Sequence, residues 1–386
     1  MKLYKDKCFK IIKNFTNKGH KKRILLGSIC ISLSLLTILS GCIKKAKASE
    51  SFEHEIIISE NKTNLEIPNE TTVEIIKETS EPIFYEKETP CETEAIPSPE
   101  LLINADNFGK TIGVNHEEFK ISDELLTQIK KQINNYPNKS AFYVVTLDGN
   151  LSFGYNINEQ FHAASSVKAP YVLYCLKEIE NGNGSLDEMM SYQKKHQEGK
   201  SGTIQYSKFG TEYSLNDIIY YTIHESDNAG FYMLHDRFPK SGYNEMLEEL
   251  GLSKMKLTGS MKFGMITPKE MLTLWNEIYN YSQESELGSY YLDLLKGAKY
   301  NFIKDELKKT MPDCEIAHKS GFNAKGRHDV AIVFGETPYF ITVMTDNPGE
   351  NSNSKHIMAM AKLLNEVINE YNIYLTNKVN MQKWRN

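Results

Sequence analysis

Hydrophobic residues first recur with a clear period near residue 118, where a folded domain is expected to begin. In ISDELLTQIKKQINNYP (121–137) they are spaced so that they fall on one face of a helix. Ser122 is suited to cap the start of this helix, and Pro137 is suited to end it. The pattern therefore predicts an amphipathic helix at the start of the domain, with one face packed on a core.

Strand patterns follow this helix and return near the end of the chain. SAFYVVTL (140–147) and LSFGYNI (151–157) are rich in β-branched and aromatic residues, and the Asp-Gly pair between them favours a hairpin turn. Three further strands are expected at 315–322, 329–335 and 339–346. SKHIMAMAKLLNEVINEY (354–371) then has the apolar face of a closing helix.

The stretch between these two groups of strands, roughly 165–310, has a mostly helical pattern. Because strands from both chain ends flank this helical middle, we expect an antiparallel sheet that joins them, with helices gathered around it. The predicted fold class is α+β: an antiparallel sheet formed from both chain ends, plus a mostly helical subdomain.

The N-terminal segment has the pattern of an export signal. Basic residues up to Arg23 precede the uncharged run ILLGSICISLSLLTILS (24–40), which leads into LSGC with Cys42 last. The LSGC ending resembles a bacterial lipobox, which implies cleavage after residue 41 and a diacylglycerol on the Cys42 sulfur. The alternative is an uncleaved anchor, although about 17 apolar residues are short for a span. Both interpretations place the rest of the chain at the outer face of the bacterial cell membrane.

Residues 42–117 have the composition of an acidic tether rich in Glu, Thr and Pro. Between Glu50 and Asp106 there are 15 acidic residues and three lysines, so the segment repels itself and buries little apolar surface. The expected organisation is a lipoprotein-type signal peptide over 1–41, the tether over 42–117, the folded domain over 118–374 and a polar tail over 375–386.

Composition narrows the range of partners. The chain of 386 residues carries 45 basic and 50 acidic residues, and it has no long basic stripe outside the N-terminus, so we expect no nucleic-acid partner. Cys91, Cys175 and Cys314 have scattered spacing and predict no disulfide framework. The sequence has no Cys/His cluster with the spacing of a zinc site. We therefore expect no metal and no other cofactor, and we expect a monomer.

Two adjacent serines in FHAASSVKAPYV (161–172) are the first candidates for chemistry. A serine hydroxyl needs a base within hydrogen-bond reach to act as a nucleophile, and Ser165 and Lys168 would share one face at a helix start. The positive end of the helix helps to keep the proton affinity of the lysine low. Ser-x-x-Lys occurs five times, but only here does it follow a hairpin and open an apolar helix. Three positions beyond Ser166 lies Ala169, so we expect Ser165 to be the nucleophile and Ser166 a packing residue.

Two further motifs have the local context of a cleft. Ser-Asp-Asn occurs once, at 226–228, although all three residue types also favour helix caps and turns. Lys-Ser-Gly occurs three times, but only the copy at 319–321 follows an apolar run and precedes further strands. On an edge strand, this copy would present a cation, a hydroxyl and open backbone to an extended ligand.

Taken in order, the three motifs resemble those of the serine β-lactamase and penicillin-binding protein superfamily. The resemblance is closest to class A β-lactamase-like catalytic domains, and it covers about 118–372 of the chain. KSGFNAKGRHDVAIVFGETPYFITV also resembles the third to fifth sheet strands of class A enzymes. The resemblance implies that the active site lies between the sheet and the helical subdomain.

The resemblance implies a catalytic role for four motif residues. Ser165 would attack the substrate carbonyl and become acylated, with Lys168 as a candidate base. Ser226 would relay a proton toward the leaving nitrogen, and Lys319 would support Ser226 electrostatically. The backbone N–H groups of Ser165 and Phe322 would form the oxyanion hole.

Other residues would bind the substrate. The resemblance implies that Asn228 binds a substrate amide, that Ser320 binds the substrate carboxylate, and that Gly321 belongs to the same binding strand. Arg327 or His328 is a further candidate to pair with a substrate carboxylate.

One departure from the family pattern concerns release of the acyl group. Class A β-lactamases carry a Glu-x-x-Leu-Asn motif on an Ω-loop before a Thr-Pro pair. Here the pair at 267–268 follows ELGLSKMKLTGSMKFG (249–264), which lacks this motif and is shorter than the family's loop. Glu248 and Glu249 fit a helix pattern and are expected to be solvated. Glu225 remains open either as a substitute base or as an exposed loop residue.

The sequence therefore predicts an extracytoplasmic serine hydrolase that forms an acyl-enzyme on Ser165 with β-lactams or D-Ala-D-Ala peptides. Deacylation is expected to be slow. The alternatives are a D,D-carboxypeptidase or transpeptidase acting on peptidoglycan stem peptides, or a β-lactam sensor or wall-binding module without turnover. Ser165, Lys168 and Lys319 argue against pure binding, because a binder requires neither a nucleophile nor a base.

Overall fold

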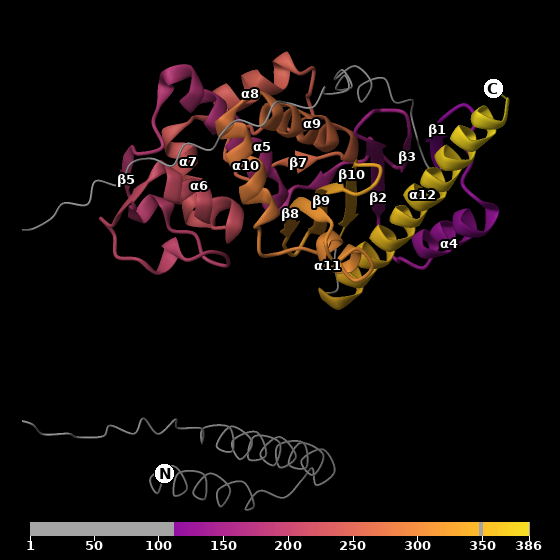
Figure 1. Cartoon of the computed structure of the whole chain (residues 1–386). Helices are drawn as coiled ribbons and strands as arrows, with labels where there is room; N and C mark the ends of the chain where they lie inside the picture. Colours follow the sequence, from indigo (N-terminus) through magenta and orange to yellow (C-terminus); the bar gives the residue numbers. More distant parts are fainter. Residues whose placement is uncertain (1–111, 347–349, 386) are drawn as a thin grey trace, which may run out of the picture. The chain divides into compact units, whose positions relative to one another are not determined.

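The computed structural model describes residues 112–346 and 350–385, and these contain a six-stranded antiparallel sheet with helices on both faces (Figure 1). The predicted signal peptide, Cys42 and nearly all of the predicted tether lie outside the described residues. The strands follow the order β1-β3-β2-β10-β9-β8 across the sheet. Their bounds are β1 (Gly113–Asn115), β2 (Ser140–Thr146), β3 (Ser152–Tyr155), β8 (Glu315–Phe322), β9 (Gly326–Phe334) and β10 (Tyr339–Asp346).

Pairing of β2 with β10 joins the two ends of the domain in the middle of the sheet, with Ser140 opposite Thr345. The predicted hairpin and the three predicted C-terminal strands are confirmed, and so is the α+β class. Side chains of β2 alternate between two cores: Tyr143 packs on one face of the sheet, and Phe142 packs on the other. Because both faces are covered, all seven β2 residues are buried.

Two layers of helix enclose the sheet. The layer on one face consists of α4 (Asp123–Asn134), α11 (Ile303–Leu307) and α12 (Glu350–Arg385). The layer on the other face consists of α5 (Lys168–Glu178), α6 (Leu215–His224), α7 (Asn228–Arg237), α8 (Lys240–Glu249), α9 (Pro268–Glu284) and α10 (Glu286–Lys296). None of the helices in the described ranges is both long enough and apolar enough to cross a bilayer.

Short elements connect the helices around the second core. They are β4 (Phe161–His162), which pairs with β7 (Met265–Ile266), β5 (Met189–Ser191), which pairs with β6 (Glu212–Ser214), the 3₁₀ turns η1 (Ala164–Val167), η3 (Lys194–His196) and η4 (Ile204–Tyr206), and the π-helical turn η2 (Ile179–Asn183). Strand β4 leads into η1, and β7 leads into α9. The pairing of β4 with β7 therefore holds the starts of η1 and α9 near each other.

Ser122 caps α4 as the sequence predicts, since its hydroxyl accepts a hydrogen bond from the Leu125 N–H. The domain nevertheless begins earlier than expected. Strand β1 starts at Gly113, within the predicted tether, and Val114 lies opposite Phe153 of β3. A three-residue strand at a sheet edge carries too little pattern to be recognised in sequence.

Helix α12 also continues beyond its predicted end and includes residues 375–385, which the sequence had suggested as a polar tail. No glycine or proline stands between 371 and 386 to stop it. Glu118 holds this last part of the helix, because its carboxylate accepts hydrogen bonds from Lys378 Nζ at 2.8 Å and from the Tyr374 hydroxyl at 2.5 Å.

Candidate active site

The three sequence motifs meet around one cavity of about 560 Å³. Ser165 comes from η1, the Ser-Asp-Asn motif from the start of α7, and the Lys-Ser-Gly motif from the end of β8. The cavity is lined by Ala164, Ser165, Glu198, Lys200, Ser201, Ser226, Asn228, Phe263, Tyr300, Ser320, Phe322, Asn323, Ala324 and Arg327.

The two adjacent serines have different surroundings. Ser165 lines the cavity. Ser166 is fully buried, and its hydroxyl donates a hydrogen bond of 2.7 Å to the Ala163 carbonyl. Ala164, just before them, has a positive φ of 47°, a strained conformation for alanine that is often found at functional sites. Ser165 therefore faces the cavity, whereas Ser166 packs inside the fold.

Lys168 begins α5 and is fully buried. Its Nζ donates hydrogen bonds to the Ser226 carbonyl at 2.5 Å and to Asn228 Oδ1 at 2.8 Å, and it lies 3.3 Å from Ser226 Oγ. In the described chain, none of its hydrogen bonds goes to Ser165. The pKa of Lys168 lies well below its usual range, first because burial disfavours the ammonium and also because the Lys319 charge repels it. The site thus favours a neutral amine, which can accept a proton.

In the Ser-Asp-Asn motif, the middle residue caps a helix, and the two outer residues line the cavity. Asp227 caps α7: its buried carboxylate accepts the N–H groups of Gly230 at 2.9 Å and Ile204 at 2.8 Å. The residues on either side of this cap, Ser226 and Asn228, line the cavity. Ser226 has a positive φ of 55°, and Asn228 donates its amide N–H to the Gly199 carbonyl at 2.9 Å.

Strand β8 is an edge strand of the described sheet, and it packs on η1. Lys319 is buried and donates a hydrogen bond of 3.1 Å to Ser226 Oγ. Burial lowers the pKa of Lys319 to about 8. At Gly321 a β-carbon would lie only 2.8 Å from the Ser165 nitrogen, so only glycine lets strand and turn approach this closely.

The backbone N–H of Phe322 points to the open edge of β8. Asn323 donates its N–H to the Gly326 carbonyl across the β8–β9 turn, which makes these two a hydrogen-bonded pair. Hydrogen-bonded and non-hydrogen-bonded pairs alternate in an antiparallel ladder. Phe322, which lies opposite Arg327 in the next pair along, therefore directs its N–H and C=O groups away from β9. This direction suits the predicted oxyanion hole with the Ser165 N–H.

The two candidates for binding a substrate carboxylate differ. Arg327 lines the cavity, and its guanidinium lies 5.1 Å from the Phe322 ring centre. His328 is fully buried, and one ring nitrogen lies 2.8 Å from the His162 carbonyl. Burial lowers the pKa of His328 to about 4, so this side chain is neutral and structural.

Glu225 is held away from the cavity. Its carboxylate accepts a hydrogen bond from Lys299 Nζ at 2.6 Å and another from the Thr203 hydroxyl, and these bonds lower its pKa. It is also absent from the cavity lining in the described chain. These contacts favour a bridge between loops over a substitute base. Glu248 is exposed and pairs with Lys256 at 2.5 Å, as expected for a solvated residue.

Phe263, which the sequence argument did not single out, stands beside Lys168. Its ring centre lies 5.8 Å from Lys168 Nζ and 5.6 Å from the Phe231 ring centre. The next residue, Gly264, accepts the Ala163 N–H at 3.0 Å, which fixes the approach of this segment to η1.

Glu270 organises the short segment that precedes Phe263. Its carboxylate, in the first turn of α9, accepts the backbone N–H groups of Ser253, Lys254 and Met255 at 2.9 to 3.2 Å. The backbone of this segment is therefore held in place ahead of Phe263, which lines the cavity. Glu198 supplies the single carboxylate among the described lining residues. Burial raises the pKa of the Tyr232 hydroxyl, and the negative charge of Glu198 raises it further.

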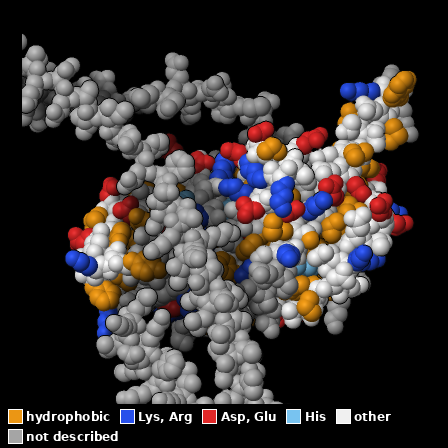
Figure 2. Space-filling view, turned by 90° about the horizontal axis from the view of Figure 1, so that it is seen from below, with side chains coloured by type: hydrophobic (Ala, Val, Ile, Leu, Met, Phe, Trp, Pro, Cys, Tyr) orange, Lys and Arg blue, Asp and Glu red, His pale blue; other side chains and the backbone are white. Residues whose placement is uncertain are grey.

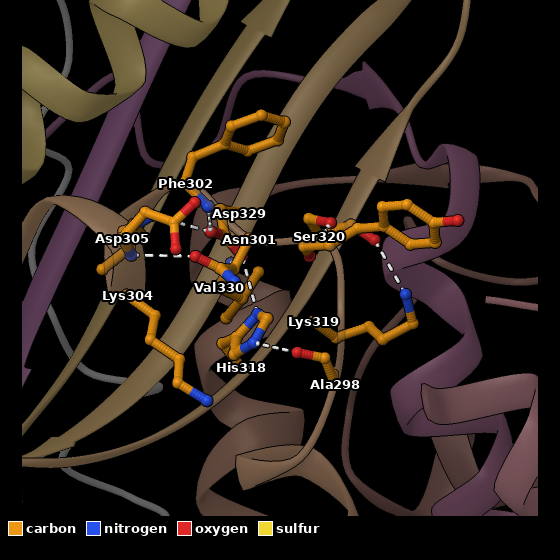
Figure 3. Close-up of polar contacts among 12 residues, drawn as sticks. Ala298, Asn301, Phe302, Lys304, Asp305, His318, Lys319, Ser320, Asp329 and Val330 are labelled. Atoms are coloured by element: carbon orange, nitrogen blue, oxygen red, sulfur yellow. Dashed lines mark hydrogen bonds and ion pairs between the residues drawn. The ribbon is translucent and has the colours of Figure 1, made fainter. Parts of the chain in front are cut away.

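Buried polar side chains of β8 and β9 anchor the loop 298–303 at another wall (Figure 3). Asp329 accepts the N–H groups of Phe302 at 2.7 Å and Ile303 at 2.9 Å, and a His318 ring nitrogen lies 3.0 Å from the Ala298 carbonyl. His318 and Asp329 also face one another at 3.8 Å. No local sequence pattern marks this anchor, because Asp329 and His318 lie far along the chain from the loop residues that they bind.

Charged side chains of both signs are intermingled over the described part of the face in Figure 2. This distribution gives no strong single-sign field on that face, which agrees with the near balance of charge in the whole chain. Within the described residues, no group of three or more potential metal ligands comes together.

The fold and the grouping of serine and lysine side chains define the serine β-lactamase and penicillin-binding class of domains. Residues 124–368 match the Beta-lactamase2 model, described as the β-lactamase enzyme family. The chain therefore belongs to this family. Among curated proteins, no sequence matches this chain.

Solved structures agree with this fold. PBP-A is 23% identical and has a TM-score of 0.60; the match covers 67% of this chain and 100% of PBP-A. A mutant of PBP-A, solved as an acyl-enzyme complex with penicillin G, is 23% identical over 64% of this chain and 97% of its own, with a TM-score of 0.59. A class A β-lactamase from Mycobacterium abscessus is 16% identical over 63% of this chain and 98% of its own, with a TM-score of 0.57.

Proposed function

We propose that the chain is an extracytoplasmic serine hydrolase that forms an acyl-enzyme on Ser165 with β-lactams or D-Ala-D-Ala peptides and releases it slowly. One observation carries the proposal: two buried lysines, Lys168 and Lys319, converge on Ser226 beside the cavity that Ser165 lines. Two ammonium ions buried this close together repel each other, and proteins hold such groups mainly where their proton affinity is used.

We infer the acylation step from these positions and from the roles that the family resemblance implies. Ser165 Oγ bonds to the carbonyl carbon and passes its proton to the neutral Lys168 amine. As the carbon–nitrogen bond breaks, the Ser226 hydroxyl donates its proton to the leaving nitrogen. Ser226 then regains a proton from Lys168, which took one from Ser165. The N–H groups of Ser165 and Phe322 stabilise the oxyanion, and each such donor contributes about 100- to 1,000-fold in turnover.

Release of the acyl group requires a water and a base to activate it. The apolar Phe263 ring occupies the wall beside Lys168. The Glu198 carboxylate lines the cavity, but it lies outside the segment before the Thr-Pro pair, where class A β-lactamases carry their Ω-loop glutamate. Slow deacylation is the expected result, and it would leave β-lactams bound as a long-lived adduct.

One observation supports the proposed substrate class, and another supports the proposed location outside the cytoplasm. The PBP-A mutant, a fold relative, forms an acyl-enzyme with penicillin G. The LSGC sequence ending at Cys42 supports attachment to the outer face of the membrane.

A penicillin that does not cross the cytoplasmic membrane should therefore label the protein on intact cells. Labelling only after lysis would contradict this location.

Labelling of the purified domain tests the proposed chemistry. Fluorescent penicillin should give a one-to-one covalent adduct by mass spectrometry, and nitrocefin should give a stoichiometric burst followed by slow turnover. The absence of an adduct would exclude the proposed function, and sustained fast hydrolysis of nitrocefin would exclude slow deacylation. Rapid release of D-Ala from a stem peptide would favour the carboxypeptidase alternative.

The rate constant of acylation should depend on pH with two limbs. It should rise with pH as Lys168 loses its proton, because only the neutral amine accepts one from Ser165. It should fall again above about pH 8, where Lys319 loses its charge. The measurement is the second-order rate constant for nitrocefin acylation against pH, with the folded state checked by circular dichroism.

Lys319→Arg is the matched control for the alkaline limb, because arginine stays charged to above pH 12. In this variant the fall above about pH 8 should disappear. A folded Lys319→Arg protein with the same alkaline limb would show that another group causes it.

A further inference from the structure

A second hollow of about 290 Å³ adjoins the catalytic cavity. Tyr300, Phe322 and Arg327 line both spaces, so they form the boundary that the two share. The Tyr300 and Phe322 side chains are 46% and 48% exposed, and their rings meet edge to face with centres 6.4 Å apart. Two large apolar side chains exposed together in a cleft are a surface that a ligand can cover.

This second hollow lies on the leaving-group side of the proposed reaction. The Ser320 hydroxyl, which would bind the substrate carboxylate, donates its hydrogen bond to the Tyr300 carbonyl. On binding, this hydroxyl would turn from the carbonyl to the carboxylate, which would then lie next to Tyr300. Asn228 and Phe263 line the catalytic cavity but not the second hollow.

The wall that carries Tyr300 is built before any ligand arrives. Asp329 holds the N–H groups that follow it, and His318 holds the carbonyl that precedes it (Figure 3). On the outer side, Lys299 donates its N–H to the His224 carbonyl at 3.0 Å. A wall fixed at both ends costs little ordering entropy when it binds a ligand.

Arg327 adds a charge to this aromatic surface. Its guanidinium lies 5.1 Å from the Phe322 ring centre and 5.4 Å from that of Phe302, and it donates a hydrogen bond to Ser354. A cation held against aromatic rings suits a ligand that carries a carboxylate next to an aromatic or bulky apolar side chain.

We propose that Tyr300, Phe322 and Arg327 form a leaving-group subsite that accepts an aromatic or bulky apolar side chain. It would favour substrates whose leaving group is larger than D-alanine, such as a C-terminal D-phenylalanine. The inference rests on the proposed function, because the side of the cleft is defined by the roles of Ser226 and Ser320.

Two N-acyl-D-alanyl esters test this subsite, one with D-phenyllactate and one with D-lactate as leaving group. In both, Ser165 Oγ bonds to the carbonyl carbon, the ester carbon–oxygen bond breaks, and the alkoxide receives its proton through Ser226. Mass spectrometry measures the second-order rate constant of acylation for each ester. The D-phenyllactate ester should react about tenfold faster, the scale on which an apolar pocket discriminates between side chains.

Replacement of Tyr300 isolates the aromatic contact. Tyr300→Ala should bring the ratio of the two rate constants close to one, whereas Tyr300→Phe, which keeps the ring, should preserve it. Equal rates for both esters in the native protein, or an unchanged ratio in Tyr300→Ala, would overturn the subsite.

Nitrocefin acylation separates the subsite from the function on which it rests. If nitrocefin acylates Ser165 but the ratio of ester rates is one, only the subsite is wrong. If neither nitrocefin nor an ester acylates Ser165, the proposed function fails and the subsite with it.

Discussion

Replacement of Ser165 by alanine is expected to abolish covalent labelling by fluorescent penicillin and the nitrocefin burst. The oxygen that forms the acyl bond is lost, and in serine hydrolases this loss costs about a million-fold in turnover. The measurement is the mass of the intact protein after incubation with the drug. A circular dichroism spectrum that matches the native protein would show that the variant is folded.

Ser166→Ala is the matched control, since it removes the same group one residue away. Ser166 is buried, and its hydroxyl bonds only a carbonyl that also accepts the Ser166 N–H. Its loss should cost about 1 kcal/mol in the free energy of unfolding and leave the extent of labelling intact. Equal loss of labelling in both variants would contradict the assignment of Ser165 as nucleophile.

Replacement of Phe263 by glutamate should shorten the lifetime of the penicillin adduct by about 100- to 10,000-fold, the range that a positioned general base contributes. The new carboxylate would stand at the wall beside Lys168, where water must be activated to attack the acyl group. It should also raise the pKa of Lys168 by offering an opposite charge, so acylation should slow at acidic pH. The adduct lifetime is measured by mass spectrometry after excess drug is removed.

Phe263→Gln separates the base from the loss of the ring, because glutamine has nearly the same shape but accepts no proton in this range. Both variants lose the contacts of Phe263 with Phe231, so their stabilities should fall alike. A glutamate variant whose adduct lives as long as that of the glutamine variant would show that another feature limits deacylation.

The sequence predicted the fold class and the convergence of the motifs because both depend on local patterns. Strand periodicity and turn residues define β2, β3, β8, β9 and β10. The choice of Ser165 over Ser166 followed from a spacing of three residues to Lys168. These signals are short in range, so a single chain displays them.

The parts that the sequence did not predict arise from contacts between distant segments. Phe263 faces Lys168 only because β4 and β7 pair, and Tyr300 stands at the cleft only because Asp329 and His318 hold its loop. A phenylalanine or a tyrosine in a polar segment gives no sign of which cavity it will line. The strand β1 was missed for a different reason, because three residues are too few to show a period.

The order of the strands has a mechanical consequence. The chain enters the sheet at β1, on one edge, whereas β8, which carries the Lys-Ser-Gly motif, forms the opposite edge, with four strands between them. Tension applied to the chain before Gly113 would first peel three residues of β1 from β3. The force would spread through the central hydrogen-bonded ladders before it reached β8. The domain could therefore be pulled by its N-terminal end while Ser165, Lys319 and the oxyanion hole keep their geometry.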